Sequence, residues 1–126
     1  MNDPRDSLLL HNSGFWQGCF VRLDHTGKEQ ERFPTSLEVK EAEDGDLLKV
    51  GRVLIAPGDR HIKVERKSLG GIIRLDDSPL VSGHKPSADF LFESVAKNYG
   101  KHSLAVIMTG MGKDGARNIG EIYRAG

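Results

Sequence analysis

The most constraining feature of the chain is an apolar run that leads directly into a cluster of glycines. Residues 104–108 read Leu-Ala-Val-Ile-Met, and Gly110, Gly112 and Gly115 follow closely. A continuous apolar run of this length is typical of a strand that is buried on both faces of a parallel sheet. Because such a sheet is covered by helices on both sides, we expect an α/β protein.

Helical patterns flank the apolar run. Between residues 86 and 99, apolar side chains recur at intervals of three and four, which predicts an amphipathic helix. Pro86 stands near its start and Gly100 follows its last apolar residue, as is usual at helix ends. Residues 116–123 repeat the helical pattern after the glycines. The predicted order is helix, buried strand, glycine turn and helix.

The middle of the chain predicts short strands. Residues 52–56 and 72–75 are apolar runs bounded by turn residues, and residues 61–66 alternate, with Ile62 and Val64 on one face. We expect a small antiparallel meander here, with His61 on its wet face. Residues 1–36 show no clean period, so no regular element is predicted for them.

Composition excludes several classes of protein. The chain has 126 residues, which suits one domain, and its 18 Lys and Arg balance its 18 Asp and Glu. Without a basic excess, nucleic-acid binding is not expected. Cys19 is the only cysteine, which fits a reducing compartment, and we expect it to be half-buried beside Phe20. The leucines near the N-terminus are too few for a membrane span, so the sequence predicts a cytoplasmic protein.

The glycine cluster supports two hypotheses. Gly110, Gly112 and Gly115 spell the G-x-G-x-x-G pattern of dinucleotide-binding folds, between an expected strand and an expected helix. Against that hypothesis, Asp114 would place a negative charge beside the pyrophosphate. In the second hypothesis the turn presents Asp114, whose carboxylate could orient an imidazole while nearby amides bind an oxyanion. A third, structural alternative is that Asp114 only caps the helix that begins near Gly115.

A family resemblance favours the second hypothesis. Residues 109–116, Thr-Gly-Met-Gly-Lys-Asp-Gly-Ala, resemble the signature around the catalytic aspartate of the CheB family, the chemotaxis protein-glutamate methylesterases. Residues 39–46, 52–62 and 83–96 resemble three further motifs of that family, in the same order. The resemblance covers roughly residues 37–126 and indicates a fragment of the catalytic domain, incomplete at both ends, after an unassigned segment 1–36.

The resemblance implies a fold, an activity and partners. The expected fold is a three-layer, mostly parallel Rossmann-like α/β sheet with a β-hairpin. The implied activity is hydrolysis of γ-glutamyl methyl esters on chemoreceptors, with methanol release, and deamidation of receptor glutamines. It uses a Ser-His-Asp triad and no cofactor. The implied partners are methyl-accepting receptors and, in the intact protein, a receiver domain.

The resemblance also assigns site residues. Asp114 matches the triad aspartate, and Met111, with Gly110 and Gly112 around it, matches the vicinity of the oxyanion and substrate. Residues 84–87 lie in a motif beside the site, to which we assign no chemistry.

The sequence departs from the family at the other two triad positions. Neither the serine motif nor the histidine motif of the family is found, so we expect the activity to be impaired. His11, Ser13, His25 and His61 are candidates for a substitute nucleophile or base, but no spacing forces them toward Asp114. No His-x-x-x-His pair occurs, and we predict no metal site.

Overall fold

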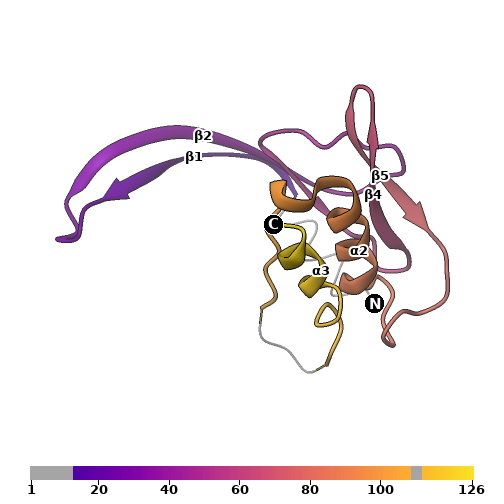
Figure 1. Ribbon diagram of the computed structural model, residues 1–126. Helices are drawn as coiled ribbons and strands as arrows, with labels where there is room; N and C mark the ends of the chain where they lie inside the picture. The colour runs from indigo at the N-terminus through magenta and orange to yellow at the C-terminus, as the bar shows by residue number, and fades with distance from the viewer. Residues whose placement is uncertain (1–12, 109–111) are drawn as a thin grey trace, which may run out of the picture. The chain divides into compact units, whose positions relative to one another are not determined.

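The computed structural model describes residues 13–108 and 112–126 (Figure 1). These residues fall into two compact units. Among the described residues, the first unit comprises 13–41 and 49–55, and the second comprises 42–48, 56–108 and 112–126. Within the described ranges, no helix is both long and apolar enough to cross a membrane.

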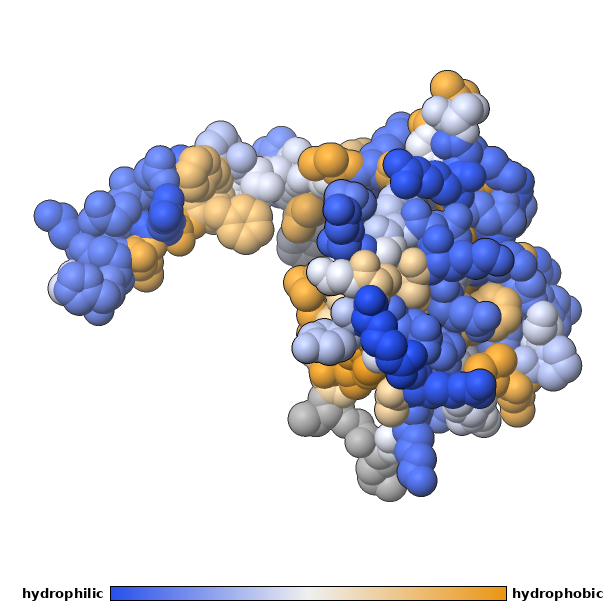
Figure 2. Space-filling model, in the orientation of Figure 1, coloured by the Kyte–Doolittle hydropathy of each residue, from blue (hydrophilic) through white to orange (hydrophobic). Residues whose placement is uncertain are grey.

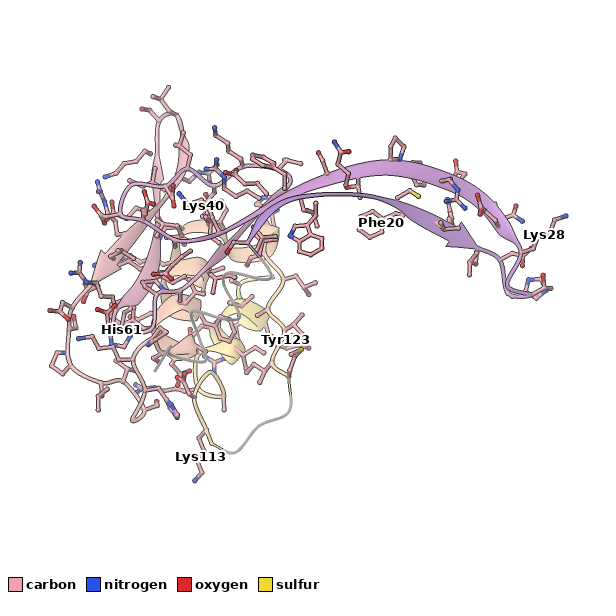
Figure 3. All side chains as sticks on the ribbon, turned by 180° about the vertical axis from the view of Figure 1, so that it is seen from behind. Phe20, Lys28, Lys40, His61, Lys113 and Tyr123 are labelled. Carbon is pink, nitrogen blue, oxygen red and sulfur yellow. The ribbon has the colours of Figure 1, made fainter. Side chains whose placement is uncertain are left out.

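The first unit is a three-stranded sheet built on a long hairpin. Strand β1 (Gly14–Leu23) pairs antiparallel with β2 (Glu29–Glu41), and β3 (Arg52–Ile55) pairs in parallel with β2. Phe20 lies along the hairpin and Lys28 lies at its tip (Figure 3). The parallel pairing of β3 corrects the expected antiparallel meander for this part of the chain.

The hairpin was not predicted by the sequence, because β1 and the first part of β2 are exposed on both faces. Trp16 lies opposite Leu37 and Phe20 opposite Phe33, so one face is apolar, yet every residue of β1 is exposed. Figure 2 shows apolar residues interrupting the hydrophilic surface of this hairpin. Cys19 is also exposed, which corrects the expectation that it is half-buried. The sequence feature that could have indicated the hairpin is the turn at Asp24, whose carboxylate accepts hydrogen bonds from the backbone N–H groups of Thr26 and Lys28.

The second unit packs helices against a two-stranded sheet. Strands β4 (His61–Lys67) and β5 (Gly70–Asp76) pair antiparallel, and α2 (Ala88–Tyr99) packs on β4 (Figure 1). A 3₁₀ turn, η1 (Gly100–His102), follows α2, and α3 (Ile119–Arg124) packs on α2 as well. The predicted antiparallel hairpin and both predicted helices are therefore confirmed.

The core of this unit is small and lies between the hairpin and the helices. Val64 and Ile73 face each other across the hairpin and are 5% and 2% exposed. Ile62, Ala42 and Ile122 are the other buried apolar residues of the described ranges. Since few side chains form this core, each of them carries a large share of its packing.

Both edges of the β4–β5 hairpin are closed by groups that are not strands. On the β4 edge, Ser94 Oγ accepts from the backbone N–H of Val64 at 3.0 Å, and the Asn98 side chain bonds the backbone of both Val64 and Arg66. On the β5 edge, residues 44–48 supply backbone and side-chain partners. The backbone groups through which an edge strand can pair with another chain are thus hydrogen-bonded within the unit.

Residues 104–108 do not form the predicted buried strand. They take part in no strand ladder of the described residues, and Leu104, Val106 and Met108 are 89%, 70% and 83% exposed. A strand that is apolar on both faces needs neighbouring strands to pair with, and the described residues offer none. Of the two small sheets, the first is mixed and the second is antiparallel, and the expected three-layer, mostly parallel sheet is not seen in them.

Ile73→Ala is expected to lower the free energy of unfolding by about 2–5 kcal/mol, because it leaves a cavity opposite Val64. The matched control is Leu69→Ala, in the turn of the same hairpin, where the side chain is 93% exposed and the change should stay within about 0.5 kcal/mol. Urea denaturation followed by circular dichroism measures both. Equal losses for the two variants would contradict this description of the core.

Candidate functional site

Asp114 lies in the loop before α3, and its carboxylate is bonded to the N-terminus of α2. Oδ1 accepts from Ser87 Oγ at 2.6 Å and from the backbone N–H of Asp89 at 3.2 Å. Oδ2 accepts from the backbone N–H of Ala88 at 2.7 Å. The first amides of a helix have no partner within the helix, and a negative charge there also interacts favourably with the helix dipole. The carboxylate therefore acts as a second cap of α2, beside the N-cap Ser87.

This geometry differs from the structural alternative derived from the sequence. Asp114 caps α2, which lies much earlier in the chain, and not α3, which follows it. Helix α3 begins only at Ile119, and its N-cap Asn118 makes no side-chain capping bond. The capping partner was hidden from sequence reasoning because it lies 27 residues away at Ser87.

The carboxyl group of Asp114 is held in its ionised form. Burial alone would raise the pKa of Asp114. The hydrogen bonds from Ser87 Oγ and from the amides of Ala88 and Asp89 outweigh it, and the charge of His84 acts in the same direction. The net result is a pKa below the ordinary value of an aspartate, so the group is a carboxylate at neutral pH.

His61 is buried at the start of β4, which corrects the prediction that it lies on a wet face (Figure 3). Its Nδ1 accepts from the backbone N–H of Ser87 at 3.1 Å, so Nε2 carries the proton and donates to the Pro79 carbonyl oxygen at 3.0 Å. The ring also stacks on Phe90, with centroids 4.4 Å apart. With both nitrogens engaged and 0% of the residue exposed, His61 cannot serve as the base of a substitute triad.

A second carboxylate fastens the same helix end to α3. Asp89 is 1% exposed, and its Oδ1 accepts from the backbone N–H of Asn118 at 2.8 Å. Its Oδ2 accepts from Ser82 Oγ at 3.1 Å, and the Asn118 side chain donates to the Asp89 carbonyl oxygen. The sequence analysis missed Asp89, although an acidic residue in the first turn after a Ser N-cap is a recognisable sign of a helix start.

The glycine loop is only partly described. Gly110 and Met111, predicted near the oxyanion, lie outside the described residues. Gly115 has a φ of +86°, and a Cβ there would lie 3.0–3.2 Å from Ile107, Ala88 and Phe92. Only glycine fits this position without strain, so close packing accounts for the third glycine of the pattern.

The other predicted site residues are not assembled around Asp114. Gly112 lies near the imidazole of His84, whose influence on Asp114 is electrostatic. His11 lies outside the described residues, and Ser13 and His25 belong to the first unit. In the described part of the chain, no hydrogen bond joins an imidazole to Asp114, and no group of three His, Cys, Asp or Glu residues could hold a metal ion. The site described here is one aspartate in a fixed position.

Asp114→Asn is expected to flatten the loss of thermal stability in acid. Because the pKa of Asp114 is lower in the folded chain than in the unfolded one, its stabilising contribution is complete above about pH 5 and is lost as the pH falls below about 4. We expect the Tm difference between the wild type and this variant to shrink as the pH falls through that window.

Other carboxyl groups with a lowered pKa titrate as well, so the Tm of the variant must be subtracted from that of the wild type at each pH. They are Asp24, Asp44, Glu65, Asp76 and Asp77. These groups are common to the wild type and the variant, so the difference isolates Asp114. Asp59→Asn, at an exposed turn position, is the matched control and should run parallel to the wild type. A parallel course for Asp114→Asn would show that the carboxylate does not cap α2.

Known proteins match this chain over most of its length. The model of the CheB methylesterase family matches residues 28–126. The protein-glutamate methylesterase/protein-glutamine glutaminase of Treponema denticola is 61% identical over 71% of this chain and 24% of its own length. The protein of the same name from Chromohalobacter salexigens is 48% identical over 99% of this chain and 33% of its own length.

A solved structure agrees. The crystal structure of the Thermotoga maritima CheB methylesterase catalytic domain is similar with a TM-score of 0.68 and 39% identity, over 71% of this chain and 47% of that one. The chain thus spans about a quarter to a third of the length of these curated relatives. On the family match and these similarities, the chain belongs to the CheB methylesterase family.

Proposed function

We propose that this chain supplies the orienting aspartate of a cytoplasmic protein-glutamate methylesterase. The observation that carries the proposal is the Asp114 carboxylate, which three donors of one helix end hold ionised and in a fixed orientation. A carboxylate of this kind can keep an imidazole in the tautomer whose free nitrogen faces a serine, and can stabilise the imidazolium that forms. The names of the relatives supply the substrate class.

The proposed reaction is hydrolysis of a γ-glutamyl methyl ester on a chemoreceptor. A serine oxygen attacks the ester carbonyl and gives its proton to the imidazole, which passes it to the departing methanol. Water then releases the glutamate in a second step of the same kind, and a primary amide would be deamidated likewise. The described residues do not bring a serine and an imidazole together in this way around Asp114, so we propose that the activity of this chain by itself is impaired.

The remaining parts of the proposal follow the family resemblance. Gly110, Met111 and Gly112 would border the oxyanion, since they precede Asp114 in the same loop. The complete domain would form the three-layer, mostly parallel sheet, in which residues 104–108 find the neighbours that they lack among the described residues. Methyl-accepting receptors, and a receiver domain in the intact protein, are the proposed partners.

Two other functions remain as alternatives. The chain could be a non-catalytic module that binds receptors or another partner, and receptor capture without ester hydrolysis would favour it. It could also bind a dinucleotide through its glycine pattern. The geometry gives this second alternative little support, because α3 begins four residues after Gly115 and has only six residues. Saturable binding of NAD, measured by fluorescence, would favour it.

The test of the proposed function is a graft into an active relative. Residues 37–126 of this chain replace the matching segment of the Treponema denticola methylesterase, and methanol release from a methylated chemoreceptor is measured. We expect the chimera to be active and Asp114→Asn to lower its kcat by about four orders of magnitude, as for other triads that lose the orienting carboxylate. The control is Asp59→Asn, which should leave the rate unchanged.

Two results would contradict the proposal. A chimera that folds and keeps its rate after Asp114→Asn would show that this aspartate is not part of the triad. Methanol release by the chain alone, lost on Asp114→Asn, would show that it carries its own serine and base and is not impaired.

A further inference from the structure

We propose that Ser87 is the positioning residue of Asp114, and that buried His61 fixes Ser87 in turn. The hydrogen bonds form one directed series: His61 Nε2 donates to Pro79, the Ser87 N–H donates to His61 Nδ1, and Ser87 Oγ donates to Asp114. The series links β4, the start of α2 and the loop before α3. The orienting role of Asp114 rests on the proposed function, but the series itself does not.

Ser87 cannot turn away from Asp114 without losing other bonds. The residue is 3% exposed, and its Oγ also accepts from the backbone N–H of Phe90 at 3.4 Å as the N-cap of α2. Its carbonyl oxygen accepts from the backbone N–H of Leu91 at 3.3 Å. With its N–H held by His61, every polar group of Ser87 has a partner, and its single hydroxyl proton is directed at Asp114.

This arrangement specifies which carboxylate atom can accept a further bond. A carboxylate offers about two acceptor positions on each oxygen. Oδ1 of Asp114 uses both of its positions, for Ser87 Oγ and the Asp89 amide, whereas Oδ2 uses one, for the Ala88 amide. We infer that Oδ2 is the atom left to take the N–H of an incoming imidazole.

The other ionisable groups around this site have different partners. The carboxylate of Asp89 is occupied by Ser82 and by the backbone N–H of Asn118. His84 acts on Asp114 by charge alone, and both nitrogens of His61 bond backbone groups. Among the described residues, Ser87 is therefore the one side chain that donates a hydrogen bond to Asp114.

The experiment is a titration of the Asp114 carboxyl carbon by ¹³C NMR, in the chain itself. Ser87→Ala should move the midpoint of Asp114 upward, because the charge-assisted bond to the carboxylate is lost. Ser87→Thr keeps a hydroxyl and should restore the wild-type midpoint. The matched control is Ser94→Ala, which removes a hydrogen-bonded hydroxyl from the same helix, on the β4 edge, and should leave Asp114 unchanged.

An unchanged midpoint in folded Ser87→Ala would overturn the proposal, as would an equal shift in Ser94→Ala. Should Ser87→Ala not fold, the imidazole ¹⁵N signals of His61 in the unsubstituted chain decide. We expect an unprotonated Nδ1 and a protonated Nε2, and the opposite tautomer would break the series. Neither readout involves ester hydrolysis, so a folded chimera that keeps its rate after Asp114→Asn would contradict the proposed function and leave this inference standing.

Discussion

The bond between the Asp114 carboxylate and the N-terminus of α2 connects parts of the second unit that are distant in sequence. It ties the loop after the apolar run to a helix end 25–27 residues earlier in the chain. From that helix end, Ser87 reaches β4 through His61, and Asp89 reaches the start of α3 through Asn118. A unit with so few buried apolar side chains depends on such polar links, because each one satisfies backbone donors that would otherwise be buried without a partner.

The same bond is compatible with both roles that the sequence suggested as alternatives for Asp114, which are capping a helix and orienting an imidazole. A capping carboxylate must be ionised to accept several N–H groups, and a carboxylate that orients an imidazole must be ionised as well. Since both roles need a fixed charge, one aspartate can fill them together. The helix end supplies the donors, and Oδ2 keeps one acceptor position for the proposed imidazole. Stability and catalysis would then draw on the same atoms and could not be varied independently at Asp114.

The sequence predicted elements whose pattern is local and missed contacts that depend on distant residues. The period of residues 86–99 and the alternation of Ile62 and Val64 were sufficient for α2 and β4, because a helix or a hairpin contains its own hydrogen-bond partners. The apolar run 104–108 was predicted as a strand and is none among the described residues, since a strand exists only beside another strand. The position of His61 could not be predicted either, because its burial depends on α2, which comes later in the chain.

The hydrogen bonds along the edge of β4 limit where residues can be inserted into or deleted from this part of the protein. Ser94 and Asn98 lie one helical turn apart on α2, and together they replace a neighbouring strand along Val64 and Arg66. One residue inserted between them would rotate Asn98 by about 100° and carry it off the strand. The turn between β4 and β5 holds the exposed Leu69 and can lengthen at little cost in free energy. Insertions and deletions in natural variants should therefore gather at the hairpin turn and avoid the last two turns of α2.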